Sequence, residues 1–314
     1  MKTAGLSERL LDGDPRALAR AISLAEENAP RAIELLRDVF PRTGRARVLG
    51  VTGSPGAGKS SLVDQLIAHY RKAGRRVGVI AVDPSSAYSG GAILGDRVRM
   101  QRHASDGDVF IRSMATRGHL GGLARASNDA IDLLDAAGFD PVLVETVGVG
   151  QDEVDVVKTA DAVAVVLVPG MGDDIQAIKA GILEIADLFV INKADRDGAD
   201  RLQADLDYML TLGDYEDRPR PKVLRTIAVR DEGVEHLRDE FDRFLEREQG
   251  QRLERRRERS LARLLSVLAE RLMARTLERV LVEDRMEQLV EAIAERRVDP
   301  YTAVEGIVEE LEGR

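Results

Sequence analysis

The middle of the chain alternates short apolar segments with longer stretches of helical character, and this alternation determines the fold class. Several segments between residues 47 and 248 are rich in β-branched residues, and some are apolar throughout, as in AVAVVLV. A strand that is apolar on both sides needs cover on both sides, which is the situation of a parallel sheet between two layers of helices. We therefore predict a doubly wound, mostly parallel α/β domain with right-handed crossovers. The predicted strands are 48–52, 77–83, 109–114, 141–146, 162–169, 187–193 and 222–228.

The segments on either side of this region are predicted to be helical. Residues 1–46 carry leucine and alanine at helical spacing with breaks at 13–15 and 28–30, which predicts two or three short helices. For residues 249–314, the spacing of leucines among arginine and glutamate residues predicts one long helix followed by a helical hairpin. Leucines recur on one side of the long helix, and a solvated helix must bury such a stripe against either its own domain or a second copy of the chain. We favour the second copy. The leucines are Leu261, Leu264, Leu265, Leu268 and Leu272.

Composition excludes several classes of protein. The 314 residues carry a net charge of −9, so the chain lacks the basic character of a nucleic-acid-binding protein. The absence of cysteine excludes disulfides, iron–sulfur clusters and thiolate zinc sites, and the four histidines show no metal-binding spacing. No run of about 18 apolar residues indicates a membrane helix, and the N-terminus has no apolar signal core. We therefore expect a cytoplasmic protein.

The first predicted strand runs into the sequence GSPGAGKSS and then directly into a predicted helix. Gly53, Gly58, Lys59 and Ser60 fit the pattern G-x-x-x-x-G-K-[ST] in the strand–loop–helix context of a phosphate-binding loop. Glycines let backbone N–H groups turn towards phosphate oxygens, and the helix N-terminus adds partial positive charge. Lys59 is expected to bridge the β- and γ-phosphates, and Ser60 to bind Mg²⁺. The residues expected to hold the phosphates are Gly53, Ser54, Pro55, Gly56, Ala57, Gly58, Lys59, Ser60 and Ser61.

The predicted strand at 187–193 ends in the sequence NKAD, which indicates the base of the nucleotide. The Asp195 carboxylate can accept hydrogen bonds from N1–H and the 2-amino group of guanine, and adenine offers neither donor. Lys193 can lie along the base, and Asn192 can tie its loop to the phosphate loop. After the last predicted strand, the Ala228 amide is a candidate donor to the 6-oxo group of guanine. The alternatives are a plain helix cap at NKAD and ATP as the nucleotide.

Three acidic residues are candidates for a Mg²⁺ site beside the phosphate loop. Asp83 and Glu145 end predicted strands, where parallel α/β sheets bind their ligands, and Asp96 ends a loop rich in glycine and serine. Each of them could instead cap the next helix. The preference for a metal rests on the phosphate loop, because Mg²⁺ bound to a nucleotide needs oxygen ligands nearby. The predicted metal ligands are therefore Ser60, Asp83, Asp96 and Glu145.

The sequence ETVGVGQ at 145–151 has the position of a γ-phosphate sensor. The residue after Gly148 is valine, where a nucleotide-hydrolysing switch often has a glutamine that orients the attacking water. We therefore predict slow hydrolysis in the isolated protein. A glycine-rich and then acidic segment at 169–181 carries Lys179, and it could close over the nucleotide, contact a partner or be a plain loop. The candidate catalytic residues in these motifs are Lys59, Glu145 and Gly148.

In their order along the chain, several of these motifs resemble those of the MeaB/ArgK family. The similar segments are GSPGAGKSS, VDPSS, GGAILGD, ETVGVGQ, PGMGDDIQAIKAG and NKAD. The similarity covers nearly the whole chain, although the helical tail matches by composition more than by motif. Members of this family are G-protein chaperones of adenosylcobalamin-dependent methylmalonyl-CoA mutase, and older members carried names as arginine/ornithine transport ATPases or kinases.

The resemblance implies a homodimeric GTPase that binds GTP or GDP with Mg²⁺ and gates cofactor loading into the mutase, which it also protects. The partner could equally be a related acyl-CoA mutase, such as isobutyryl-CoA mutase. The resemblance places the magnesium-associated acids at Asp83, Asp96 and Glu145, and a mobile switch at 169–181 with Lys179 as the catalytic or coupling cation. The domains are then a helical extension at 1–46, a P-loop GTPase domain at 47–248 and a helical dimerisation arm at 249–314.

Three other functions compete with this interpretation. A nickel-type metallochaperone GTPase would need cysteine or clustered histidine ligands, and the sequence has neither. A kinase or ATPase linked to basic amino acid transport would need a second, acceptor site, for which the sequence gives no signal. A non-catalytic nucleotide-binding adaptor would retain GTP without hydrolysing it.

Overall fold

A single parallel sheet organises the larger part of the molecule. The computed structural model describes residues 4–83, 100–103, 105–115, 122–146, 159–170, 185–213, 215, 219–250, 252–279 and 283–312. The chain divides into two units, Met1–Leu253 and Glu254–Arg314, and the sheet belongs to the first. The predicted α/β class with a doubly wound parallel sheet is confirmed.

The sheet has seven strands in the order β3-β2-β4-β1-β5-β6-β7, and every neighbouring pair is parallel. The connection that leaves β1 leads towards β2, whereas the one that leaves β5 leads towards β6. The carboxyl ends of these two neighbouring strands therefore form a topological switch point, where such sheets bind ligands. The strands are β1 (Val48–Gly53), β2 (Val77–Asp83), β3 (Val109–Ala115), β4 (Val142–Thr146), β5 (Ala162–Leu167), β6 (Leu188–Asn192) and β7 (Lys222–Thr226).

Three strands end earlier than the sequence predicts, β6 by one residue at Asn192 and β5 and β7 by two residues each. β5 stops at Leu167, two residues before Pro169, which has no N–H to donate to a neighbouring strand. β7 stops at Thr226 because the chain turns at once into a short 3₁₀ helix, Ala228–Arg230. The apolar run TIAV therefore belongs only partly to the sheet.

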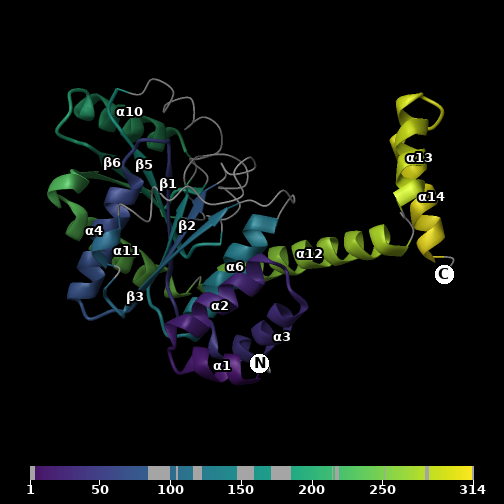
Figure 1. Ribbon diagram of the computed structural model, residues 1–314. Coiled ribbons are helices and arrows are strands. Elements are labelled where there is room, and N and C mark those ends of the chain that lie inside the picture. The colour runs from purple at the N-terminus through teal and green to yellow at the C-terminus, as the bar shows by residue number, and fades with distance from the viewer. Residues whose placement is uncertain are drawn as a thin grey trace. The chain divides into compact units, whose positions relative to one another are not determined.

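Helices cover both faces of the sheet, which explains why its inner strands are apolar throughout. In β5, Ala164 and Val166 pack on one side, whereas Val163 and Val165 pack on the other. The covering helices are α4 (Lys59–Lys72) and α11 (Val234–Arg247) on the first face, and α6 (Gly122–Ala136) and α10 (Ala199–Leu212) on the second (Figure 1).

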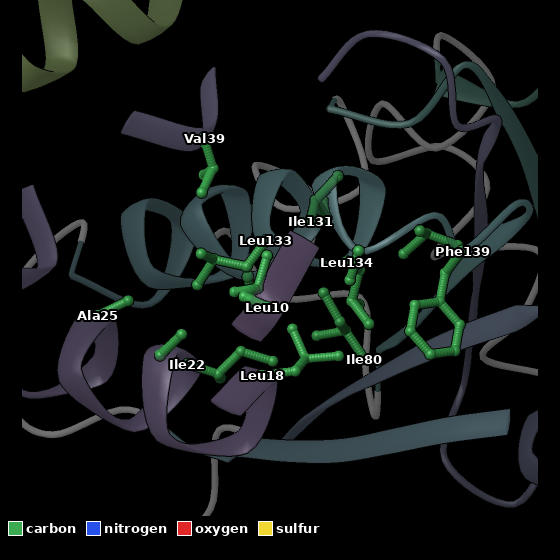
Figure 2. Close-up of a cluster of buried hydrophobic side chains, with 14 of the residues drawn as sticks. Leu10, Leu18, Ile22, Ala25, Val39, Ile80, Ile131, Leu133, Leu134 and Phe139 are labelled. Atoms are coloured by element: carbon green, nitrogen blue, oxygen red, sulfur yellow. The ribbon is translucent and has the colours of Figure 1, made fainter. Parts of the chain in front are cut away.

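The N-terminal helices pack against α6 and share its core. Leu10, Leu18 and Ile22 are fully buried, and they join the cluster that contains Leu133 of α6 and Ile80 of β2 (Figure 2). The segment 1–46 is thus packed into the first unit. The three helices are α1 (Ala4–Leu11), α2 (Pro15–Glu26) and α3 (Pro30–Val39).

Polar contacts fix the position of α2 among these helices. The Asp14 carboxylate caps α2 by accepting hydrogen bonds from the Arg16 and Ala17 amides, and Pro15 occupies the first helical turn. At the other end, the Arg112 guanidinium of β3 forms an ion pair with the Glu26 carboxylate. The helix is therefore held at both ends as well as along its apolar side.

The second unit is helical. It contains most of α12 (Arg252–Arg279), together with α13 (Glu283–Ala294) and α14 (Pro300–Glu312). α13 and α14 lie side by side, with an ion pair of 2.8 Å between Arg285 and Glu310. The leucine stripe of α12 is 49–64% exposed at Leu261, Leu264, Leu265, Leu268 and Leu272. Among the described residues, no helix has both the length and the apolar character needed to cross a membrane.

Two adjacent leucines test whether α1 is part of the core. Leu10 is fully buried and Leu11 is 37% exposed. We expect Leu10→Ala to lower the free energy of unfolding by about 2–5 kcal/mol, because it leaves a cavity between α1 and α6. The matched control Leu11→Ala should cost less than about 1 kcal/mol. Urea titration of the full chain measures both values, and equal small effects would contradict this packing.

Candidate nucleotide-binding site

The loop between β1 and α4, residues 53–60, has a backbone that only glycine accommodates at key positions. Gly53 and Gly58 have φ values of 142° and 88°. A Cβ atom at Gly53 would lie 2.1 Å from the Val166 carbonyl oxygen of β5. Both the positive φ and this close approach exclude larger residues. The phosphate loop, as we call residues 53–60, thus lies at the switch point of the sheet.

Lys59 is folded onto the phosphate loop that it follows. Its Nζ donates hydrogen bonds to the carbonyl oxygens of Gly53 and Ser54, at 2.7 and 3.0 Å, and the residue is 5% exposed. A buried ammonium requires such acceptors. The contacts fix the lysine at the first turn of α4, where a phosphate would meet its charge.

Ser60 and Glu145 bring two oxygen donors together beside this loop. Ser60 Oγ donates a 2.6 Å hydrogen bond to Glu145 Oε1, and both residues are buried. The β1–β4 register pairs Glu145 with Val51, which packs on the face of the sheet that α4 covers, so the Glu145 side chain lies on the same side as Ser60 of α4. A hydroxyl and a carboxylate are hard oxygen ligands of the kind that Mg²⁺ prefers, so this pair fits the predicted metal site.

Asn192 joins the two halves of the site. Its Nδ2 donates to the Ala57 carbonyl oxygen of the phosphate loop at 2.8 Å. Its Oδ1 accepts hydrogen bonds from Thr226 Oγ1 and from the Ala228 amide, both at 3.1 Å. The register between β6 and β7 places Thr226 directly opposite Asn192. The phosphate loop and the segment after β7 are therefore held by one buried amide.

Lys193 and Asp195 follow β6 and lie near the phosphate loop. Lys193 has a left-handed backbone, with φ 55°, and its Nζ donates to the Gly56 carbonyl oxygen at 2.8 Å. Burial, together with the nearby charge of Arg196, lowers the pKa of Lys193. The Asp195 carboxylate is 37% exposed and lies 3.3 Å from the Arg230 guanidinium. The lysine stem thus spans the gap between the NKAD segment and the phosphate loop.

The residues after β7 form a compact turn, which we call the base loop and define as residues 227–232. The Ala228 N–H donates a hydrogen bond to Asn192 Oδ1 in the structure. Its predicted hydrogen bond to the 6-oxo group of guanine stays a prediction. To form that bond, this N–H would have to change its acceptor. The adjacent Val229 amide makes no hydrogen bond within the described part of the chain. Two amides at the tip of the base loop are therefore candidates for that contact.

Several predicted site residues lie outside the described ranges. These are Asp96, Gly148, Lys179 and most of the segment 169–181. Asp83 is the last residue of β2, and the description of it covers the backbone alone. The assignments of these residues to metal, phosphate or catalysis remain predictions.

Sequence reasoning missed four residues that complete the site. Thr226 holds Asn192, Arg230 contacts Asp195, and a His69–Asp231 pair of 2.7 Å ties the base loop to α4. None of the four belongs to a motif, and His69 lies 162 residues from its partner. The strand register could have suggested Thr226, because it follows from the parallel pairing of β6 with β7. The other contacts depend on the packing of α4 against the base loop.

The fold and this site define a P-loop nucleotide-binding protein. Residues 18–280 match the model of a family described as methylmalonyl Co-A mutase-associated GTPase MeaB. The chain belongs to this MeaB family of GTPases, as its motifs predict.

Individual relatives are consistent with this assignment. A Pyrococcus abyssi protein whose name calls it a GTPase is 49% identical over 314 residues, which covers 98% of this chain and 96% of the relative. The Escherichia coli GTPase ArgK is 45% identical over 60% of this chain and 58% of its own length. A mouse protein named methylmalonic aciduria type A homolog, mitochondrial, is 39% identical over 75% of this chain and 61% of its own length.

A solved structure extends the likeness to the whole fold. The crystal structure of an LAO/AO transport system kinase superposes with a TM-score of 0.73 at 28% identity. The match covers 99% of this chain and 97% of that protein. The helical segments before and after the sheet are thus part of the shared architecture.

The role of Asn192 as a link between the loops can be tested by substitution. Asn192→Asp keeps an acceptor for Thr226 and Ala228, but it cannot donate to the Ala57 oxygen and brings negative charge towards it. We expect the free energy of unfolding to fall by about 1–3 kcal/mol. GDP affinity should fall by at least about tenfold, as the two loops separate. Chemical denaturation and titration with fluorescent GDP measure the two effects.

Thr226→Val is the matched control, since it removes one of the two donors to the same oxygen. It should cost about 1 kcal/mol or less and leave most of the GDP affinity. Equal losses in the two variants would show that the bond to Ala57 is not what couples the loops.

Proposed function

We propose that this MeaB-family protein is a GTP-hydrolysing chaperone that gates adenosylcobalamin loading into methylmalonyl-CoA mutase, or a related acyl-CoA mutase, and protects that enzyme. The proposed binding of a guanine nucleotide is supported by the buried Asn192 side chain, which links the phosphate loop to the base loop. Asp195, whose carboxylate suits guanine, lies three residues after Asn192 and contacts the base loop through Arg230. The mutase part is supported by the description of the family. A cytoplasmic location remains our expectation from the sequence.

Guanine selection would depend on Asp195. Its carboxylate would accept hydrogen bonds from N1–H and the 2-amino group, while the stem of Lys193 would lie along the ring. Lys193 is suited to this position because the bond from Nζ to the Gly56 oxygen holds the side chain across the gap. A site with a dedicated carboxylate rejects bases that lack the two donors, since the carboxylate would then be left unpaired.

Phosphate binding and hydrolysis would depend on the phosphate loop. Its backbone amides and the Lys59 ammonium would stabilise the negative charge that develops as water attacks the γ-phosphate in line. Mg²⁺ would be held by Ser60 and Glu145 and would neutralise charge on the phosphates. Within the described ranges, no three histidine or acidic side chains cluster as a metal site, so the remaining ligands of the ion would come from phosphate, water or residues outside those ranges. Asp83 and Asp96 are the predicted candidates, and the Gly148 amide is the predicted γ-phosphate sensor.

Slow intrinsic turnover is the expected behaviour, because valine follows Gly148 where a water-orienting glutamine is common. A partner that orders the segment 169–181 and brings Lys179 to the nucleotide would raise the rate. We expect the mutase to increase the GTP turnover of the wild type by at least about tenfold, within the range of positioned charges in phosphoryl transfer. Lys179→Ala should keep the basal rate and lose the stimulation. Phosphate release with and without methylmalonyl-CoA mutase measures both.

Three results would contradict this scheme in different ways. Fast turnover that the mutase leaves unchanged would exclude partner control. Transfer of the γ-phosphate to a protein or an amino acid would favour the kinase alternative. Retention of unhydrolysed GTP in the presence of the mutase would favour a non-catalytic adaptor.

We also propose that the leucine stripe of α12 forms a homodimer interface. An exposed apolar stripe of this length on one helix is unusual for a surface that faces only water. A second copy of the chain offers an identical stripe, and a two-fold axis would pair the two stripes.

Charge placed on the stripe should separate the subunits. The double variant Leu268→Glu, Leu272→Glu is expected to weaken dimerisation by at least about a hundredfold, because dimerisation would remove two carboxylates on each chain from water. Ser266→Glu adds the same side chain on a different side of the helix, by its 3.6-residue period, and should leave the dimer intact. Sedimentation velocity over a range of concentrations distinguishes the two. A wild-type monomer at all concentrations would exclude this interface.

A further inference from the structure

The base loop has a tightly constrained backbone. Ile227 and Glu232 pair with each other in an isolated antiparallel bridge, with hydrogen bonds of 2.9 and 3.3 Å between their backbones. Asp231 turns the chain between them in a left-handed conformation, with φ 59°. The next residue, Gly233, has φ 76°, and a Cβ atom there would lie 2.2 Å from the Arg225 carbonyl oxygen. These contacts restrict the backbone conformations that the base loop can adopt.

The buried His69 side chain of α4 binds the base loop at Asp231. His69 Nε2 lies 2.7 Å from Asp231 Oδ1, and His69 is 6% exposed. An ionised carboxylate has no proton to donate, so Nε2–H is the donor and Asp231 the acceptor. Because α4 begins at Lys59, one helix positions the phosphate loop at its start and the base loop nearly three turns later, at about 3.6 residues per turn.

The other side-chain contacts of the base loop cannot replace this one. The Arg230–Asp195 pair is 3.3 Å long between side chains that are 58% and 37% exposed, and such surface pairs contribute little. The Ala228 amide is fixed to Asn192, but that bond lies on the β6 side of the loop. Asp231 thus depends on His69 for its buried partner.

We propose that His69 is a positioning residue for guanine recognition, which it serves by fixing the base loop so that a tip amide meets the 6-oxo group. This proposal rests on the proposed binding of guanine nucleotides. A carboxylate released from His69 would let the left-handed turn relax and shift the tip amides away from the base. The contacts of Asp195 to N1–H and the 2-amino group would be kept, because Asp195 lies on a different segment.

Two analogues separate these contacts. In 6-thio-GDP, sulfur replaces the 6-oxo oxygen while N1–H and the 2-amino group remain, so a weaker acceptor faces the base loop. In IDP, the 6-oxo group and N1–H remain and the 2-amino group is missing. The ratio of GDP to 6-thio-GDP affinity therefore reports on the base loop, and the ratio of GDP to IDP affinity reports on Asp195.

The experiment measures these two ratios by competition with fluorescent GDP. The wild type should prefer GDP over 6-thio-GDP by about fivefold, the value of one ordinary hydrogen bond. His69→Leu should reduce this preference to about unity and leave the GDP-to-IDP ratio within about twofold of the wild type. His69→Gln should restore the preference, because its amide nitrogen can take the place of Nε2 as a donor.

His103→Leu is the matched control. His103 is also buried, and its Nε2 lies 3.0 Å from Oδ1 of Asp64 in α4, which makes a second His–Asp contact that involves this helix among the described residues. The His103→Leu variant should leave both affinity ratios unchanged, since Asp64 lies in the first two turns of α4, away from the base loop. A loss of the 6-thio-GDP preference in this variant would show a general effect of α4 and overturn the proposal.

Other outcomes have distinct meanings. Equal weakening of all three nucleotides in His69→Leu would overturn the proposal and leave a structural role. A wild type that binds GDP no better than ADP would refute guanine binding itself, whatever the variants do. If His69→Leu does not fold, Asp231→Asn takes its place, because asparagine tolerates the left-handed turn and keeps an uncharged acceptor. It should lower the 6-thio-GDP preference by about twofold, and an unchanged preference would overturn the proposal.

Discussion

A parallel sheet has to be covered on both faces, and this requirement organises the first unit. On one face, α4 and α11 provide the cover. On the other face, α10 covers one half of the sheet and α6 the other, while the N-terminal helices pack against α6 and complete its core. The side chains of Leu18 and Ile22 are as deeply buried as those of the central strands. The helices before the sheet therefore contribute to its stability rather than form a separate attachment.

The nucleotide site follows from the same arrangement. Because all strands are parallel, their carboxyl ends meet at one edge, and the phosphate loop, Glu145 and Asn192 are brought to that edge by β1, β4 and β6. Buried hydrogen bonds then fix the relative positions of these groups. The Ser60–Glu145 contact orients the oxygens suited to Mg²⁺, and Asn192 connects the two loops. The site is thus preorganised before any ligand arrives, which favours both affinity and catalysis.

Much of this could be predicted from the sequence, and the reasons are local. Apolar runs located the strands, and the strand–loop–helix context at Gly53 to Ser60 identified the phosphate loop. The ends of the strands were less predictable: Ile227 and Ala228 continue the apolar run of β7, but the chain there folds into the 3₁₀ turn that forms the base loop. Hydrophobicity alone cannot distinguish a strand residue from a buried turn residue.

The contacts that complete the site could not be predicted, because they join residues distant in the sequence. The His69 imidazole meets Asp231 only because α4 packs against the base loop, and nothing in the sequence around either residue signals the pair. Likewise, the family resemblance identified the class of protein, but it could not show that the side-chain amide of Asn192 binds both the phosphate loop and the base loop. Long-range pairing of polar side chains requires the packed structure.

Gly58 shows how closely the two ends of the site are linked. The left-handed backbone of the phosphate loop at this position already favours glycine. A Cβ atom there would also lie 2.4 Å from the Asn192 side-chain nitrogen. The absent methyl group is therefore what lets the amide of Asn192 reach Ala57. A residue that sequence motifs assign to phosphate binding thus also determines how the Asn192 side chain reaches the phosphate loop. A side chain at Gly58 would therefore disturb both loops at once, and under the proposed function the contacts to the phosphates and to the base would change together.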